Sequence, residues 1–477
     1  MKRRNIYCLL VGLLLIVTFT SCGKKTEYTH AIPSDATTVA SIDLKSVAEK
    51  CGINDEENST LKQHLLDALK NGLNEETSNQ ISKILDKPSK SGIDFKQPVY
   101  YYLSKNFSWK TVIDLSVCDK GDLNKTIKSL AKSQLCTEPE ETDNFIYSVV
   151  NNKYVIAYNK GTALLVESPQ GATDQLLECI DKVMTEKKEN SFCSSKSFSQ
   201  LTDRKGDVKF YENLEASSFG GDMTFQDGNV LLQIEKIGGK NVQPTANNTF
   251  QPITNALLNR FPKSLPFILS MGLNGTQSYN DLAAAIGLDS FNSPVVQKLM
   301  CALQGDFTLG FNTWDGKNFS FLAYAQTRDA AAIRSLCTLK DELGGTFKKL
   351  GTTDFEYHLM NTHIWYGLDG DLLYLTNNGK LVHYNSNKSG SNDSYMQNPY
   401  AAQAKGKRLF FIGDPASLSK VILQQRRFNI QPLAQNIECV RGYDVSPTSW
   451  KVEMIMKDKR TNALKQLVKI ARQIVGM

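Results

Sequence analysis

The chain has 477 residues, of which 41% are hydrophobic and 22% charged, a composition typical of globular proteins with room for two or three domains. Its 55 Lys and Arg residues against 49 Asp and Glu give a net charge of +6, which falls to +3 (52 against 49) without residues 1–21. This near-neutral balance, without a basic stripe, argues against nucleic-acid binding.

The N-terminus has the pattern of a signal peptide. Three basic residues precede an uncharged apolar run, Ile6–Phe19, after which Ser21 stands directly before Cys22. The run is shorter than the roughly 20 residues that a helix needs to cross a bilayer. We therefore expect residues 1–21 to be a cleaved leader and residues 22–31 a lipidated tether. Acyl chains on Cys22 would anchor the protein to a membrane, at about 0.8 kcal/mol per buried CH₂.

The predicted elements after the tether form a first set of strands and helices. It comprises a strand at Val39–Leu44, helices at Val47–Gly52 and Leu61–Leu73, strands at Gln97–Leu103 and Thr111–Val117, a helix at Asp122–Lys132, and a hairpin that starts at Phe145 and turns at Asn159–Gly161.

A second, similar set follows in the same order. It comprises a strand at Ile268–Met271, strands at Gly305–Phe311 and Phe319–Ala325, a helix at Asp329–Leu343, a hairpin that starts at Phe355 and turns at Asp369–Gly370, and a final helix at Asn462–Val475.

The two sets indicate a tandem duplication. The matched stretches are Ile32–Pro33 with Phe261–Pro262, Val39–Ile42 with Ile268–Met271, Gln97–Leu103 with Gly305–Phe311, Phe145–Asn151 with Phe355–Asn361, and Lys205–Gly206 and Phe210 with Lys405–Gly406 and Phe410. We expect two α+β domains of antiparallel hairpins with packed helices, at 32–240 and 252–477. A linker at 241–251, rich in Asn, Pro and Thr, would separate them.

The lipobox-like Ser21–Cys22, the Ile32–Ala36 opening with its strand and helix, and the overall length resemble the Bacteroidetes lipoproteins grouped as domain of unknown function 4836. The resemblance implies an envelope lipoprotein without an assigned activity, and it supplies no functional residue beyond Cys22. Surface-exposed members of that lipoprotein class carry an acidic cluster after the cysteine, whereas Gly23–Glu27 contains two lysines and one glutamate. We expect an outer-membrane protein that faces the periplasm.

Ten cysteines become eight once Cys8 leaves with the leader and Cys22 is acylated, and none of the eight forms a C-x-x-C pair. This spacing predicts neither a disulfide framework nor a zinc site. Cys179, Cys301 and Cys337 fall on apolar faces of predicted helices, which favours buried thiols.

Hydrolase, metalloprotease and nucleotide-binding motifs are missing, so we expect no catalytic residues, cofactor or metal. His30 lies in the tether and His64 on a predicted helix. His358 and His363 would have opposite pleat parity on a continuing strand, which argues against a shared metal. His383, like His358 and His363, belongs to the second copy. Asp369–Asp371 lacks the further acidic ligands of a calcium loop and is explained by a hairpin turn.

Two other features allow a binding role but have simpler explanations. Asn385–Pro399 is polar and without periodicity, which favours a mobile insertion over a binding loop. Tyr100–Tyr102 and Trp365–Tyr366 place aromatic rings on both faces of strands, which favours cross-strand packing over a glycan or peptide platform.

Together, these patterns predict a non-catalytic, membrane-anchored binding or structural protein whose partner is a protein, peptide or glycan. The alternative is an unrecognised periplasmic hydrolase, with an acidic pair or a Ser and Lys in a cleft between the two copies.

Overall fold

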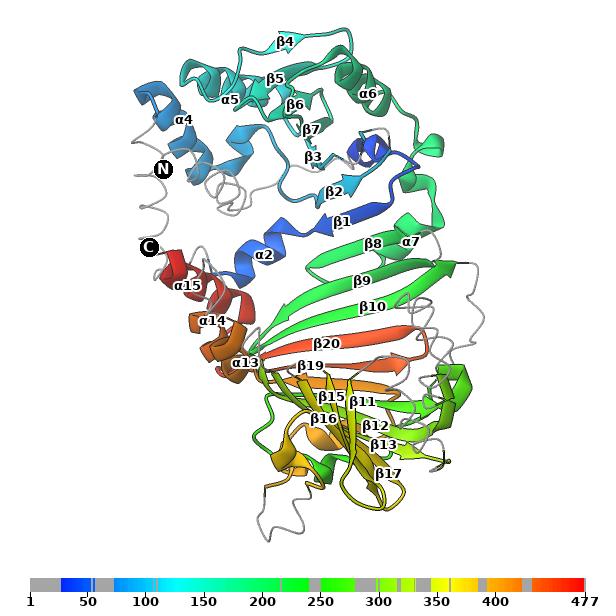
Figure 1. Ribbon diagram of the computed structural model, residues 1–477. Helices are drawn as coiled ribbons and strands as arrows, with labels where there is room; N and C mark the ends of the chain where they lie inside the picture. Colours follow the sequence, from blue (N-terminus) through cyan, green and yellow to red (C-terminus); the bar gives the residue numbers. More distant parts are fainter. Residues whose placement is uncertain are drawn as a thin grey trace. The chain divides into compact units, whose positions relative to one another are not determined.

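The computed structural model describes residues 27–52, 55, 73–105, 107–108, 110–214, 217–239, 250–278, 297–298, 301–314, 319–329, 331, 345–359, 362–384, 393–422 and 431–475 (Figure 1). The chain divides into two compact units. The first consists of Met1–Asp227, Ile234–Lys240 and Thr461–Val468, and the second of Gly228–Gln233, Asn241–Arg460 and Lys469–Met477. The predicted linker 241–251 lies outside the described residues apart from Phe250 and Gln251.

The first repeat contains ten strands, all paired antiparallel where a register is defined. Their order in the sheet is β10-β9-β8-β1-β2-β3-β7-β6-β5-β4. The bounds are β1 (Thr38–Ile42), β2 (Val99–Leu103), β3 (Val112–Ser116), β4 (Glu140–Glu141), β5 (Ile146–Val150), β6 (Tyr154–Tyr158), β7 (Thr162–Glu167), β8 (Val208–Leu214), β9 (Ser217–Gln226) and β10 (Asn229–Gly239).

The second repeat has the same order, β20-β19-β18-β11-β12-β13-β17-β16-β15-β14. Its bounds are β11 (Phe267–Asn274), β12 (Leu303–Trp314), β13 (Phe319–Thr327), β14 (Thr346–Lys349), β15 (Asp354–Leu359), β16 (Thr362–Asp369), β17 (Leu372–Thr376), β18 (Leu409–Gly413), β19 (Ile437–Ser446) and β20 (Ser449–Met456). Every strand of one repeat therefore has a counterpart in the other, as expected for a duplicated domain.

Helices lie between the strands of both repeats, so the fold mixes helices with a strand-rich antiparallel sheet. The first repeat has η1 (Glu27–Ala31), α2 (Leu44–Lys50), α4 (Glu75–Asp86), η3 (Pro88–Ser91), α5 (Lys120–Lys132), α6 (Asp174–Met184), η4 (Lys188–Asn190), η5 (Phe192–Ser194) and α7 (Lys196–Thr202). Later in the chain come η6 (Leu258–Arg260), η9 (Gly379–Leu381), η10 (Tyr395–Gln397), η11 (Ala401–Ala404), α13 (Pro415–Ile422), α14 (Gln431–Asn436) and α15 (Ala463–Val475).

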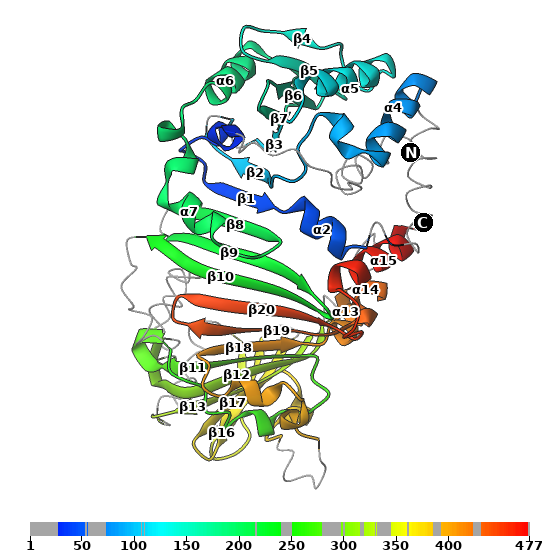
Figure 2. The same ribbon diagram turned by 180° about the vertical axis from the view of Figure 1, so that it is seen from behind.

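The sheet of the first repeat is covered on both faces, because apolar residues alternate along its strands. One core contains Tyr102, Val155 and Leu164 together with Ile180 of α6. The other contains Tyr158 and Ala163 together with Leu123 and Ile127 of α5. Accordingly, α5 and α6 flank β5, β6 and β7 on different sides (Figures 1 and 2).

Side-chain caps fix where these helices begin. The Asp119 carboxylate accepts a hydrogen bond from the backbone N–H of Asp122 at 2.9 Å, so α5 begins at Lys120, two residues before the predicted start. Thr173 caps α6 in the same way, through the N–H of Leu176 at 3.3 Å.

The second repeat also has two cores. Phe261, Ile268, Tyr324, Tyr374 and Phe410 are buried in one of them. The other contains these residues: Leu273, Leu303, Ala325, Phe355, Tyr357, Tyr366 and Leu373. The predicted helices at Leu61–Leu73 and Asp329–Leu343 fall largely outside the described residues.

Two matched stretches from the sequence comparison need a correction. The match of Phe145–Asn151 with Phe355–Asn361 is three residues out, because the strand registers make Tyr147 equivalent to Asp354 rather than to Tyr357.

The other correction is of one residue. Val39 pairs with Tyr211 on β8, and its counterpart Ile268 pairs with Ile412 on β18. Tyr211 and Ile412 are therefore equivalent, whereas the sequence match aligned Phe210 with Phe410. A match between two phenylalanines does not determine which face of the sheet each side chain occupies. Shifting the alignment of a strand by one residue moves every side chain to the opposite face.

No helix within the described ranges is long and apolar enough to cross a membrane.

Candidate functional site

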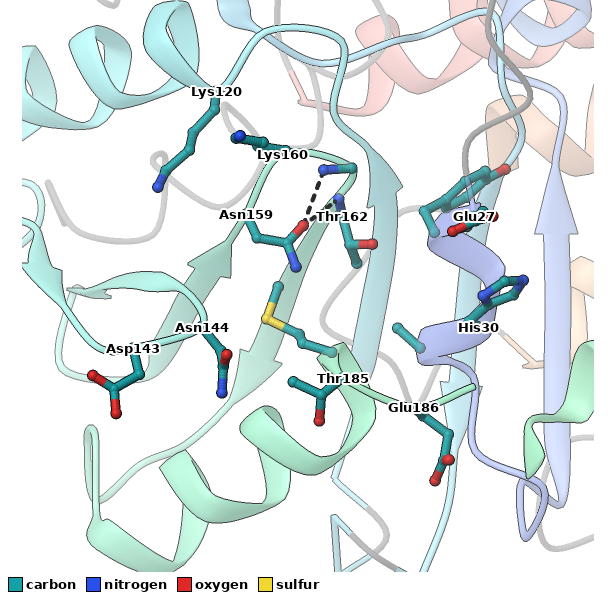
Figure 3. A pocket seen from close by; sticks show the side chains of 14 residues that line it. Glu27, His30, Lys120, Asp143, Asn144, Asn159, Lys160, Thr162, Thr185 and Glu186 are labelled. Atoms are coloured by element: carbon teal, nitrogen blue, oxygen red, sulfur yellow. Dashed lines mark hydrogen bonds between the residues drawn. The ribbon is translucent and has the colours of Figure 1, made fainter. Parts of the chain in front are cut away.

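A pocket of about 580 Å³ lies in the first repeat (Figure 3). Its floor is formed by the buried residues Tyr28, Ala31 and Thr162. More accessible residues surround this floor: Glu27, His30, Lys120, Asp143, Asn144, Asn159, Lys160, Gly161, Met184, Thr185 and Glu186. Most of these side chains are polar, so the pocket suits a polar ligand.

The pocket walls come from separate parts of the chain. Figure 3 shows Glu27 and His30 of η1 on one side and Asp143 and Asn144 on the opposite side. The turn between β6 and β7, with Asn159, Lys160 and Thr162, and the end of α6, with Thr185 and Glu186, complete the lining.

Hydrogen bonds fix the turn between β6 and β7. The side-chain oxygen of Asn159 accepts from the backbone N–H groups of Gly161 at 3.0 Å and Thr162 at 2.9 Å. Such Asx turns hold a tight loop in one conformation. They leave the amide nitrogen of Asn159 as a donor at the pocket wall.

The charges around the pocket have both signs. Lys120 and Lys160 provide ammonium groups, and Glu27, Asp143 and Glu186 provide carboxylates. The Lys120 ammonium lies 3.7 Å from a Glu141 carboxylate oxygen, a partly exposed pair that leaves it available to solvent. The pocket can therefore complement a ligand that carries both amino and carboxylate groups.

The hydroxyl of Thr185 is already used in the fold, because it donates to the carbonyl of Asp181 at 2.7 Å. The Asn144 amide likewise donates to the Asp181 carboxylate at 2.7 Å. These contacts stabilise the end of α6, and they do not give the Thr185 hydroxyl the arrangement of an activated nucleophile.

A buried carboxyl group lies close to the pocket floor. Asp114 on β3 is fully buried, and neither of its carboxylate oxygens has a hydrogen-bond partner. Burial raises its pKa well above the ordinary value. Burial also raises the pKa of Tyr28, with further contributions from the charges of Tyr100 and Asp114. Asp114 is therefore neutral over a wide pH range and electrostatically coupled to a pocket residue.

A family model described as Domain of unknown function (DUF4836) matches residues 28–223 and, a second time, residues 219–464. The chain belongs to this family. The two matches fall on the two repeats described above, and the first match ends and the second begins within β9.

No curated protein matches this DUF4836 chain. Among solved structures, crystal form IV of TP0453 shares 12% identity at a TM-score of 0.27, covering 44% of this chain and 81% of that one. Crystal form III gives 12% identity and a TM-score of 0.28, with 46% and 83% covered. Crystal form I gives 10% identity and a TM-score of 0.24, with 75% and 96% covered. These likenesses are too distant to bear on function.

The two DUF4836 repeats differ at the place of the pocket. Ile32 and Phe261 each precede a proline, and their N–H groups donate to Thr29 and Leu258, so Ala31 of η1 corresponds to Arg260 of η6. The turn after β6 corresponds to the turn after β16, because Tyr158 pairs with Ala163 as Leu368 pairs with Leu373. Asn159 therefore corresponds to Asp369.

In the second repeat, Arg260 and Asp369 form an ion pair, with side chains only 21% and 16% exposed. This ion pair joins the two elements whose counterparts, η1 and the turn after β6, both line the pocket of the first repeat. The first repeat has a methyl group and a neutral amide at the same positions, and its pocket remains open.

The sequence-predicted site residues are widely separated. Cys22, the predicted lipidation site, lies outside the described residues, as do His64 and Cys337. His30 lines the pocket. The ring of His383 lies 2.7 Å from an Asp354 carboxylate oxygen in the second repeat.

His358 and His363 lie together, which overturns the expectation from pleat parity. They are direct cross-strand partners on β15 and β16, with ring centroids 4.1 Å apart. Parity applies along one strand, but the chain reverses between these two histidines. Within the part of the chain that the structure describes, no group of three or more His, Cys, Asp or Glu side chains is arranged to hold a metal ion.

The remaining predictions have mixed outcomes. Tyr100, Tyr102 and Tyr366 are buried, in line with packing, whereas Tyr101 and Trp365 are half-buried. Asp369 is in an ion pair within a hairpin turn, in line with the rejection of a calcium loop.

The loop prediction at Asn385–Pro399 is wrong for its described part, residues 393–399. Tyr395 is 2% exposed, and its N–H donates to the Phe261 carbonyl at 2.9 Å, so core packing holds this part in place. Residues 385–392 lie outside the described ranges.

The described cysteines carry thiols rather than disulfides. Cys179 and Cys301 are half-buried rather than buried. On α6, Cys179 flanks the buried stripe of Leu176, Ile180 and Val183 instead of belonging to it, which explains its partial exposure.

Proposed function

We propose that the protein is a lipid-anchored lipoprotein of the cell envelope, held through Cys22 in the outer membrane and facing the periplasm, as in the Bacteroidetes lipoproteins. The leader-like residues 1–21 and the Ser21–Cys22 pair support this proposal. We also propose that the two repeats are α+β domains with packed helices, at 32–240 and 252–477, joined by a linker at 241–251.

We further propose that the protein acts by binding, without catalysis, and that its ligand occupies the pocket of the first repeat. The observation that carries this proposal is the difference between the repeats. Arg260 and Asp369 are paired in the second repeat, whereas Ala31 and Asn159 leave the corresponding pocket open.

The charges of the pocket favour one ligand class, a polar envelope peptide with free amino and carboxylate groups. The carboxylates of Asp143 and Glu186 would attract its amino groups, and the ammonium groups of Lys120 and Lys160 its carboxylates. No exposed aromatic ring lines the described pocket to stack on a sugar face, so a glycan is the weaker alternative.

The tether would hold this pocket close to the membrane. Glu27, the first residue of the pocket wall, is the fifth residue after Cys22. Five residues reach at most about 18 Å when fully extended. The ligand would therefore be bound at the membrane surface.

Mass spectrometry of the mature protein tests the anchor. We expect an N-terminal, acylated Cys22, and we expect Cys22→Ser to abolish acylation and release the protein from the membrane. An intact Met1 or an unmodified sulfur at Cys22 would contradict the location.

Binding of a synthetic cell-wall stem peptide tests the pocket. The matched probe is the same peptide with its amino and carboxylate groups capped, and a neutral disaccharide represents the glycan alternative. We expect saturable binding of the charged peptide alone. Binding of the disaccharide instead would overturn the ligand class.

A double variant transfers the ion pair of the second repeat into the pocket. We expect Ala31→Arg with Asn159→Asp to weaken peptide binding at least about tenfold. Lys125→Ala, on the exposed side of α5, is the control. If the double variant unfolds, Lys160→Ala at the exposed rim replaces it. Unchanged binding in a folded pocket variant would exclude this pocket as the site.

A further inference from the structure

The second repeat places two imidazole rings side by side at an accessible position, whereas the proposed peptide pocket belongs to the first repeat. His358 on β15 and His363 on β16 are opposite each other, and their rings are 4.1 Å apart at an interplanar angle of 19°. Directly opposite residues have Cβ atoms about 4.5 to 5.5 Å apart. Rotation of the two stacked rings about their side-chain bonds can therefore aim one nitrogen of each ring at a common ion, at a bond length of about 2.0 to 2.1 Å.

A carboxylate fixes the orientation of one of these rings. The Glu356 carboxylate lies 2.8 Å from Nδ1 of His363. Because a carboxylate accepts hydrogen bonds, Nδ1 carries the hydrogen and Nε2 keeps its lone pair. Metal-binding histidines commonly donate their second N–H to a carboxylate in this way. The Glu356 side chain is 19% exposed and that of His363 is 46%, so the carboxylate is the more buried partner and the imidazole remains open to solvent.

His383 shows which part of this arrangement is unusual. It too lies 2.7 Å from a carboxylate oxygen, that of Asp354, and its other neighbour is the ring of Tyr374 at 4.7 Å. Only the pair on β15 and β16 combines a carboxylate-bound imidazole with a second imidazole, among the histidines that the structure describes.

We propose that His358 and His363 bind a divalent transition-metal ion through one ring nitrogen each, and that Glu356 orients His363 without binding the metal. Imidazole ligands favour Cu²⁺, Ni²⁺ and Zn²⁺ over Mg²⁺ or Ca²⁺. Since no third protein ligand joins them within the described residues, the ion keeps coordination positions for water or another small ligand. The site is an exchangeable surface site and does not depend on the peptide pocket.

A nearby tryptophan makes this inference directly measurable. The ring of Trp365 stacks on His363 at 5.6 Å. A Cu²⁺ ion bound there quenches tryptophan fluorescence. We expect Cu²⁺ added to the full-length protein at neutral pH to give saturable quenching with one ion per chain.

Three variants test the roles of the residues. His358→Asn and His363→Asn should each weaken Cu²⁺ binding by about tenfold or more, and Glu356→Gln by about tenfold while saturation is retained. His383→Asn is the matched control and should leave the affinity unchanged. Trp365→Phe should retain calorimetric binding while losing most of the quenching.

The opposite results would overturn the proposal. Absence of saturable binding would exclude the site. Unchanged affinity in a double His358→Asn, His363→Asn variant would place the bound ion elsewhere. An equal loss of Cu²⁺ affinity in His383→Asn would show that Cu²⁺ binds to histidines non-specifically. Peptide binding by the first repeat is measured separately, so its failure leaves this test intact.

Discussion

Replacing Asp114 by asparagine would remove an ionisable group from the core of the first repeat while nearly preserving the shape of the side chain. The Asp114 carboxyl is fully buried on β3, and both of its oxygens lack hydrogen-bond partners. A buried polar group in this condition costs about 1 to 3 kcal/mol, and more when it is charged. An asparagine amide at this position would also lack partners, so the two side chains differ mainly in ionisation. At neutral pH the carboxyl of the unfolded chain is ionised, and folding must either protonate it or bury its charge, whereas asparagine has no such cost. We therefore expect the free energy of unfolding to rise in Asp114→Asn at neutral pH.

The size of this effect should depend on pH. Burial raises the folded-state pKa of Asp114 well above its ordinary value of 3.8. The folded state thus binds this proton more tightly than the unfolded chain. The resulting stability is fully present below pH 3.8 and is lost as the pH rises through the folded-state pKa. The wild type should lose up to about 1.4 kcal/mol per pH unit relative to Asp114→Asn within that window.

Urea unfolding of both proteins from pH 4 to pH 6, followed by circular dichroism, measures this difference. The free-energy gap should widen by up to about 3 kcal/mol over that interval. Tyr324 occupies the equivalent position on β13, and its hydroxyl donates to the Tyr384 carbonyl at 2.9 Å. Tyr324→Phe is the control, expected to cost about 1 kcal/mol at every pH. If the free energy of unfolding changes with pH by the same amount in wild type and Asp114→Asn, the reasoning is wrong.

Two further substitutions test the packing of the first repeat by the same unfolding measurement. Gly92 has a φ of +84°, and an added Cβ would lie 2.4 Å from the Asp119 carbonyl, so Gly92→Ala should cost about 2 kcal/mol or more. Gly161→Ala, where a Cβ meets no atom within 4 Å, should cost much less, and equal losses would contradict this account. Ile180→Ala should cost about 2 to 5 kcal/mol, because Ile180 of α6 is completely buried. Lys182→Ala on the exposed side of α6 should change the free energy of unfolding by less than about 0.5 kcal/mol. A larger change would show that the exposed side of α6 also contributes to stability.

The duplication could be predicted from the sequence because turn residues and apolar alternation recur in both copies. Ile32–Pro33 and Phe261–Pro262 open equivalent turns in the structure. The register was harder to predict. Phe210 and Phe410 look equivalent by residue type. The strand pairing with β1 and β11 shows instead that Phe210 is equivalent to Phe411.

The pocket could not be predicted, because its walls come from η1, from two turns and from the end of α6, which are far apart in the chain. None of those segments has a motif. Asp114 is an acidic residue within the predicted strand Thr111–Val117, and it alternates with Ile113 and Leu115, so the sequence pattern places it on the more polar face with Ser116. Sequence alternation alone could not show that its carboxyl would be left without a hydrogen-bond partner.

The strand order of each repeat ends on one side in a short, charged strand. β4 consists of Glu140 and Glu141, both exposed, and β14 includes Lys348 and Lys349. A long apolar strand at such a position would offer its free N–H and C=O groups to the sheet of another molecule. Like charges repel when two identical edges approach, so the glutamates oppose pairing of β4 with a second β4, and the lysines oppose pairing of β14 with a second β14.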